Sequence, residues 1–101
     1  MIRSVTDLWG HEIYLTDERW THICEEHPEM SGFDDHVMET VQKGGRFQDS
    51  IRPDIFLYYR DFEDLSSDNT TIVVVVRFGF ASDGSENNFI VTAYAIFRQR
   101  R

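Results

Sequence analysis

The feature that most constrains the fold is a pair of strongly β-forming segments joined by a linker too short to hold a helix. Residues 71–80 read TIVVVVRFGF and residues 88–97 read NFIVTAYAIF, and the linker between them is the polar stretch ASDGSEN. β-Branched and aromatic residues favour strands, and a parallel neighbour would need a crossover of about a dozen residues. The two segments are therefore predicted to pair as an antiparallel hairpin.

The same reasoning extends the sheet toward the N-terminus. Residues 55–62 (IFLYYRDF) precede the polar linker EDLSSDNT, and residues 46–51 (RFQDSI) have weaker strand character. Short polar linkers again favour antiparallel neighbours. These segments together predict a four-stranded antiparallel meander, while the weak alternation of HEIYL, residues 11–15, suggests a short opening strand.

Two helices are predicted before the sheet. In TDERWTHICEEHPEM, residues 16–30, Thr16 is placed to cap a helix that Pro28 ends. The buried stripe of this helix follows helical spacing through Trp20, Ile23, Cys24 and His27. A second helix in GFDDHVMETVQKGG is expected to begin at a cap of Asp34 or Asp35, to carry Phe33, Val37 and Val41 on one side, and to end at Gly44 and Gly45.

The expected fold is therefore α+β, with N-terminal helices packed on one face of the four-stranded meander. A chain of 101 residues forms one domain of this kind, with the helical part at about residues 16–44 and the sheet at about 46–98. If the last hairpin is symmetric, paired residues have numbers that sum to about 169. The apolar face then holds Ile72, Val74, Val76, Phe78 and Phe80 opposite Phe97, Ala95, Ala93, Val91 and Phe89.

Composition restricts the classes of function. Eighteen acidic residues against ten basic ones give a net charge of -8, which repels polyanions and counts against a simple nucleic-acid binder. Cys24 is the only cysteine, so no internal disulfide forms. The N-terminal segment has no apolar run typical of a signal peptide, and TIVVVV is too short to span a membrane. We expect a soluble cytoplasmic protein that does not interact with membranes.

The second face of the predicted hairpin carries candidate functional groups. Val73, Val75 and Arg77 are expected opposite Ile96, Tyr94 and Thr92. Arg77 could clamp a phosphate with Thr92 and Tyr94 as neutral donors, but such side chains are also common on a solvated sheet face. Tyr58 and Arg60 share a face with each other and are candidates for substrate binding, although the loop after residue 62 leaves open which face this is.

The first helix carries two histidines with different expected surroundings. His27 belongs to the apolar stripe at the C-terminal end of the helix, where it can be structural or catalytic. His22 points nearly opposite that stripe and is either solvated or a general acid or base. Metal binding is not expected, because residues five apart do not share a helix face and no HExxH motif is present. Lys43 is the only lysine, which also argues against a nuclease core of the D…(D/E)xK kind, and no cofactor is expected.

Two motifs, W-x-H-I…H-P-E and F-I-V-T-A-Y, give the chain a family resemblance. With the strands around them, from about residue 13 to residue 98, the chain resembles small phage-associated and bacterial domains grouped with the barnase, EndoU, colicin and RelE-like ribonucleases. The resemblance implies N-terminal helices on a four-stranded meander and metal-independent cleavage of RNA through attack of a 2′-hydroxyl. Carried over by motif, the candidate catalytic residues are His22, His27, Arg77, Thr92 and Tyr94.

The chain departs from that family in its charge, since RelE-like toxins are usually strongly basic. Three classes of function therefore remain after the sequence analysis. The first is a small ribonuclease, such as the toxin of a toxin-antitoxin or phage-related system, with RNA and a cognate antitoxin as partners. The second is a catalytically inactive acidic binding module, such as an antitoxin, an immunity protein or a nucleic-acid mimic. The third is a structural partner domain, and the sequence leaves the oligomeric state open.

Overall fold

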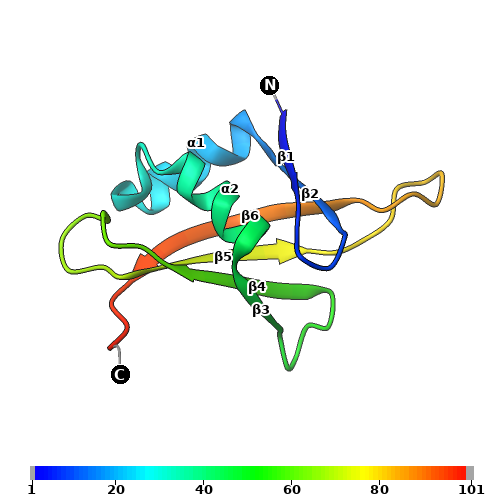
Figure 1. The fold of residues 1–101 in the computed structure, drawn as a ribbon. Coiled ribbons are helices and arrows are strands. Elements are labelled where there is room, and N and C mark those ends of the chain that lie inside the picture. Colours follow the sequence, from blue (N-terminus) through cyan, green and yellow to red (C-terminus); the bar gives the residue numbers. More distant parts are fainter. Residues whose placement is uncertain (1, 100–101) are drawn as a thin grey trace.

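A computed structural model describes residues 2–99 and contains one mixed β-sheet with two α-helices on one side of it (Figure 1). The strands are β1 (Ile2–Thr6), β2 (Glu12–Thr16), β3 (Gly45–Gln48), β4 (Ile55–Asp61), β5 (Thr71–Arg77) and β6 (Asn88–Ile96). The helices are α1 (Asp17–Glu26), the short 3-10 helix η1 (Pro28–Met30) and α2 (Asp34–Lys43). The protein is therefore of the α+β class.

The predicted four-stranded antiparallel meander is wrong. The sheet has six strands in the order β1-β2-β6-β5-β4-β3, and β2 pairs with β6 in parallel through Ile13 opposite Asn88 and Tyr14 opposite Phe89. The other neighbours are antiparallel. The prediction failed because it placed only the segments after the helices in the sheet. Strands β1 and β2 precede the helices in sequence, yet their hairpin joins the sheet through the parallel pairing of β2 with the last strand, β6.

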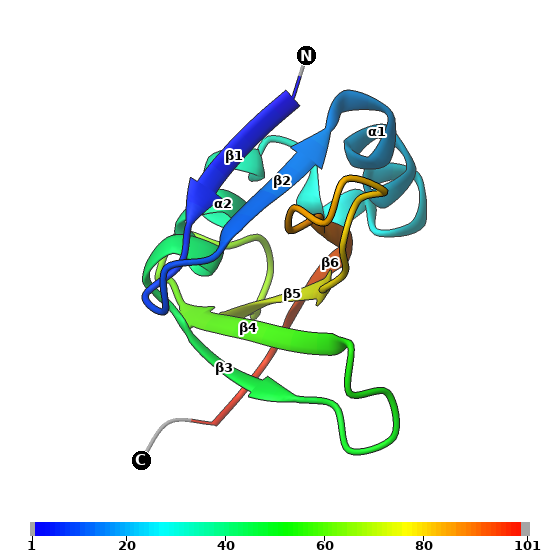
Figure 2. The same ribbon diagram turned by 90° about the vertical axis from the view of Figure 1, so that its right-hand side faces the viewer.

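The sheet curls around α2, which is its main packing partner (Figure 2). Helix α2 packs against β1, β4 and β5, and so contacts both halves of the sheet. Two ion pairs reinforce this arrangement, because Arg3 of β1 binds Asp34 at 2.8 Å and Asp35 at 2.7 Å in the first turn of α2. Helix α1 and η1 cover β6 instead.

The helix boundaries largely follow the expected chemistry. The hydroxyl of Thr16 caps α1 by accepting a hydrogen bond from the backbone N–H of Arg19 at 3.1 Å, as predicted. The predicted cap of α2 by Asp34 or Asp35 is wrong, since Phe33 occupies the N-cap position without a side-chain hydrogen bond. Gly44 ends α2 as predicted, where a Cβ atom would lie only 2.4 Å from the carbonyl oxygen of Tyr59.

Strands β5 and β6 pair two residues away from the predicted register. Val73 lies opposite Tyr94 and Val75 lies opposite Thr92. A shift by an even number of residues keeps each side chain on its predicted face. Between Val75 and Val76 the register changes by one more residue, so that Val91 is the extra residue of a β-bulge.

The bulge changes which side chains reach the core. Ile90, 1% exposed, lies opposite Val76 beneath the helices in place of the predicted Val91. Phe80 and Phe97, also predicted on the apolar face, are exposed because they lie beyond the ends of β5 and β6. The core that forms consists of Ile13, Leu15, Ile23, Met30, Val37, Met38, Val41, Tyr58, Ile72, Val74, Val76, Ile90 and Ala93.

Neither helix of the described residues 2–99 has the length and apolar character needed to cross a lipid bilayer. Both α-helices are 10 residues long and carry charged outer faces. Their apolar sides are used for packing on the sheet. The opposite face of strands β3 to β6 carries no helix (Figure 1) and is called the open face below.

Candidate functional site

An apolar groove with a volume of about 420 Å³ runs across the open face. Strands β3 to β6 each contribute to it, because alternate residues along a strand point to the same side of the sheet. Its lining residues are Phe47, Leu57, Tyr59, Thr71, Val73, Tyr94 and Ile96, with Arg98 just after β6. Within the described part of the chain, this lining includes no carboxylate, although the protein holds eighteen.

One predicted histidine lies beside this groove. His27 caps the C-terminal end of α1, and the centre of its ring is 5.8 Å from the ring centre of Tyr94. Its Nδ1 atom is 3.8 Å from a carboxylate oxygen of Glu29, and one third of its side chain is exposed. The arrangement places an accessible imidazole, with a carboxylate behind it, next to a phenol that lines the groove.

The other predicted residues of β5 and β6 share the open face but are spread along it. Thr92 lies opposite Val75, two residues further from the C-terminal end of β6 than Tyr94. Arg77 was predicted opposite Thr92 but lies opposite Phe89, because the two-residue register shift and the bulge add up. Its Nε atom pairs with Asp54 at 3.3 Å, near the start of β4. The predicted phosphate clamp of Arg77, Thr92 and Tyr94 is therefore not one compact cluster.

The two candidates from β4 lie on the opposite side of the sheet. Tyr58 and Arg60 pair with Val74 and Ile72, whose side chains face the helices. Arg60 binds Glu39 of α2, with 3.1 Å between its Nε and the carboxylate. Tyr58 is fully buried. The structure thus separates these two residues from the groove, and each has a partner on the helix side.

Tyr58 belongs to a buried polar cluster that the sequence did not indicate. Its hydroxyl donates to the Oδ2 atom of Asp7 at 2.5 Å, and an Nη1 atom of Arg46 lies 3.2 Å from the same hydroxyl. The other oxygen of Asp7 accepts hydrogen bonds from the backbone N–H groups of Trp9 and His11 at 2.9 and 2.8 Å. Burial, and then the contact with Asp7, raise the pKa of Tyr58 well above its usual range.

Aromatic rings enclose the cation of this cluster. The guanidinium carbon of Arg46 is 4.2 Å from the ring centre of Trp9 and 4.5 Å from that of Phe56. The side chain of Asp7 is completely buried and that of Arg46 is 15% exposed. Because its members are bonded to one another and enclosed, the cluster links the β1–β2 turn to β3 and β4 and is structural in character.

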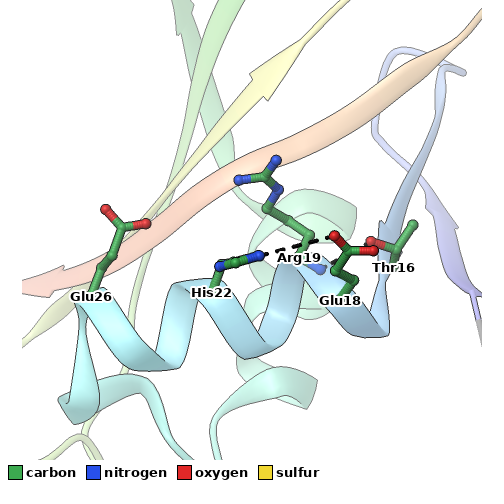
Figure 3. Close-up of a pocket in the computed structure, with 5 residues that line it drawn as sticks. All are labelled: Thr16, Glu18, Arg19, His22 and Glu26. Carbon is green, nitrogen blue, oxygen red and sulfur yellow. Dashed lines mark hydrogen bonds and ion pairs between the residues drawn. The ribbon is translucent and has the colours of Figure 1, made fainter.

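The second predicted histidine lies in a polar hollow of about 370 Å³ on α1. Figure 3 shows the imidazole of His22 along the surface of the helix between Glu18 and Glu26, with Arg19 projecting nearby. Its ring nitrogens are 4.0 Å from Glu18 and 3.9 Å from Glu25, and more than half of the side chain is exposed. His22 is thus surrounded by carboxylates and separate from the groove lining.

A third group of titratable residues lies between α2 and the loop after β4. The centre of the His36 ring is 4.9 Å from the ring centres of Phe33 and Phe62, and its Nε2 atom is 2.8 Å from a carboxylate oxygen of Asp64.

In residues 2–99, no group of three or more His, Cys, Asp or Glu side chains has an arrangement suited to a metal ion. Burial raises the pKa of the Cys24 thiol, which makes it a weak nucleophile at neutral pH.

The His36–Asp64 contact gives a prediction for the acid range. The hydrogen bond from His36 lowers the pKa of Asp64 below its ordinary value of 3.8. A carboxyl whose pKa is lower in the folded state stabilises the fold above its unfolded pKa, and this contribution is lost as the pH falls through the folded pKa. In His36→Ala, the pKa of Asp64 measured by NMR titration is therefore expected to rise toward the ordinary value. An unchanged pKa of Asp64 would contradict the contact. The control is His22→Ala, which should leave the pKa of Asp64 unchanged because His22 lies beside Glu18 and Glu25 instead.

Comparison of the chain with known protein families, with curated proteins and with solved structures finds no match. The candidate site is thus defined by geometry. Sequence reasoning identified Tyr94 of the lining and His27 beside it, but missed Tyr59, Phe47 and Arg98 as lining residues. Strand alternation was available as a signal for Tyr59, but its face depended on the unknown pairing of β4.

Proposed function

We propose that the protein is a metal-independent ribonuclease that cleaves single-stranded RNA at the open-face groove. The observation that carries the proposal is the contact between His27 and Tyr94 at a groove whose described lining has no carboxylate. In a protein with a net charge of -8, this surface, which Asp61 and Glu29 flank, repels a polyanion less than α1 with its four carboxylates does. A proton-transferring group and a hydroxyl donor lie together at that surface.

The proposed reaction assigns one role to each group. The imidazole of His27 accepts the proton of a ribose 2′-hydroxyl, whose oxygen forms a bond to the adjacent phosphorus. The bond from phosphorus to the 5′-oxygen breaks, and that oxygen leaves with a proton from solvent or from the phenol of Tyr94. The products are a 2′,3′-cyclic phosphate and a 5′-hydroxyl end. Glu29, 3.8 Å from Nδ1 of His27, stabilises the imidazolium that forms.

The experiment is cleavage of a 5′-labelled single-stranded RNA by the purified protein in the presence of a chelator. We expect fragments that end in a 2′,3′-cyclic phosphate. The same sequence with 2′-deoxyribose at every position should remain intact, because it lacks the attacking hydroxyl. The proposal would be overturned if the protein cut neither free RNA nor RNA bound to ribosomes. It would also be overturned if cleavage disappeared when the chelator was added.

A second function is favoured by one observation, the charge of the helical side. Helix α1 carries four carboxylates, those of Asp17, Glu18, Glu25 and Glu26. Its basic side chains are Arg19 and His22. An acidic surface of this kind suits an antitoxin, an immunity protein or a nucleic-acid mimic that binds a basic partner. This function predicts salt-sensitive binding to a cationic domain together with no cleavage of RNA.

A further inference from the structure

The open-face groove contains aromatic rings that the proposed reaction does not use. Phe47 of β3 and Tyr59 of β4 lie side by side, with ring centres 6.1 Å apart, and both line the groove. Phe47 lies on the edge strand of the sheet and is 55% exposed, so that its ring is accessible to a ligand. An exposed aromatic surface in a groove of about 420 Å³ is of a size that binds small planar groups.

Arg98 adds a fixed cation at one end of the groove. Its guanidinium carbon is 5.4 Å from the ring centre of Tyr59, and its Nη2 atom donates to Asp61 at 2.9 Å. Its backbone N–H also donates to the hydroxyl of Thr70 at 2.9 Å. The backbone contact places Arg98 beside the aromatic rings before any ligand binds, so that little conformational entropy is lost on binding.

We infer that Tyr59 and Phe47 stack on unpaired nucleobases of the RNA and that Arg98 contacts the adjoining phosphate. The inference rests on the proposed function, since RNA is the ligand. Bases have apolar faces that stack on aromatic rings in any sequence, whereas a duplex hides those faces and presents phosphates, sugars and base edges. The acidic remainder of the surface repels those phosphates. The groove therefore selects single strands with exposed bases over duplexes.

The choice of nucleobases over another occupant follows from the charge of the groove. A second copy of this chain would bring a further net charge of -8 toward the same face. The single charged side chain among the described lining residues is Arg98, which pairs with Asp61 at 2.9 Å. A guanidinium has five N–H donors, so that it can bind a phosphate as well as this carboxylate. The apolar lining and the rings of Phe47 and Tyr59 suit a base, and the guanidinium of Arg98 suits a phosphate.

The test measures binding separately from cleavage. The probes are fluorescein-labelled oligonucleotides of 2′-O-methyl uridine, which cannot be cut by 2′-hydroxyl attack, and abasic oligonucleotides of the same length. Fluorescence anisotropy is expected to show tighter binding of the base-containing strand, and tighter binding of that strand than of a duplex of equal length. Phe47→Ala should weaken binding of the base-containing strand by about 5- to 150-fold, the effect of removing a stacking aromatic ring.

Control variants distinguish stacking from general effects on the surface. Tyr59→Phe keeps the ring and should bind normally, while Tyr59→Ala should bind like Phe47→Ala. Phe80→Ala removes an aromatic ring that is 77% exposed outside the groove, and it should leave affinity unchanged. Arg98→Ala should weaken binding of the uridine and abasic strands alike and should reduce the dependence of affinity on salt.

The outcomes separate this inference from the proposed function. Equal affinity for abasic and base-containing strands, or an undiminished preference in Phe47→Ala, overturns the stacking role even if RNA is cleaved. Base-dependent binding without any cleavage supports the stacking role and overturns the ribonuclease. If the protein binds neither strand and sediments as a dimer that Phe47→Ala dissociates, the occupant of the groove is a second copy and the inference is wrong.

Discussion

Replacing His27 with alanine is expected to lower the rate of RNA cleavage by about 10²- to 10⁴-fold, the usual contribution of a proton-transferring side chain. The reason is its position, because the imidazole lies against Tyr94 at the rim of the groove. The variant should also lose the limb of the pH–rate profile that reports the base. Single-turnover cleavage of a labelled oligonucleotide, measured across the pH range, gives both quantities.

The matched control for this experiment is His22→Ala. His22 is on the same helix but lies among Glu18 and Glu25, outside the groove lining, so the variant should cleave at the wild-type rate. His27→Gln serves as a second variant if alanine perturbs the end of α1, and thermal unfolding monitors both. A large loss of rate in His22→Ala with a normal rate in His27→Ala would move the catalytic role to the polar hollow on α1.

The largest expected effect on stability comes from Asp7. In Asp7→Ala, the free energy of unfolding should fall by about 3 to 5 kcal/mol, the cost of removing one partner from a buried ion pair. The substitution leaves Arg46, the hydroxyl of Tyr58 and two backbone N–H groups without their acceptor. Since total stabilities are about 5 to 15 kcal/mol, the variant should lose a large fraction of its stability. Urea denaturation followed by circular dichroism measures the loss.

Two further variants check that the loss arises from the cluster. Tyr58→Phe removes one donor to Asp7 and should cost less, about 1 to 3 kcal/mol, because Arg46 and the backbone still bond the carboxylate. Asp68→Ala changes an exposed aspartate in the loop after β4 and should stay within about 0.5 kcal/mol of the wild type. If Asp7→Ala were no less stable than Asp68→Ala, the cluster would not support the fold.

Local features of the fold could be predicted because their causes lie within a few residues. Thr16 caps the start of α1, and Gly44 ends α2 where the chain passes close to β4. The alternation of Ile72, Val74 and Val76 identified the buried face of β5. An error of two residues in the β5–β6 register left these faces intact. The bulge at Val91 was not predictable in this way, because one extra residue gives no change in composition.

The failures concern contacts between distant parts of the chain. Strand β1 has only Ile2 and Val5 as apolar residues, and nothing in its five positions shows that Arg3 will meet α2. The face of Tyr58 depended on how β4 pairs after a loop of undetermined geometry. The sequence around Asp7 shows no pattern that sets it apart from a solvated aspartate, and the curl of the sheet encloses it with Tyr58 and Arg46.

The position of β6 between β2 and β5 has a consequence for how the chain reaches its native state. The amide of Asn88 donates to the carbonyl oxygen of Glu12 across 76 residues of sequence, where the parallel pairing begins. A contact between residues so far apart in sequence forms slowly, because closing the long loop costs entropy before the contact stabilises the fold. During synthesis, the hairpin of β1 and β2 must therefore wait with one edge unpaired until residues 88 and 89 have been added. Until then, that edge is open to pairing with other chains.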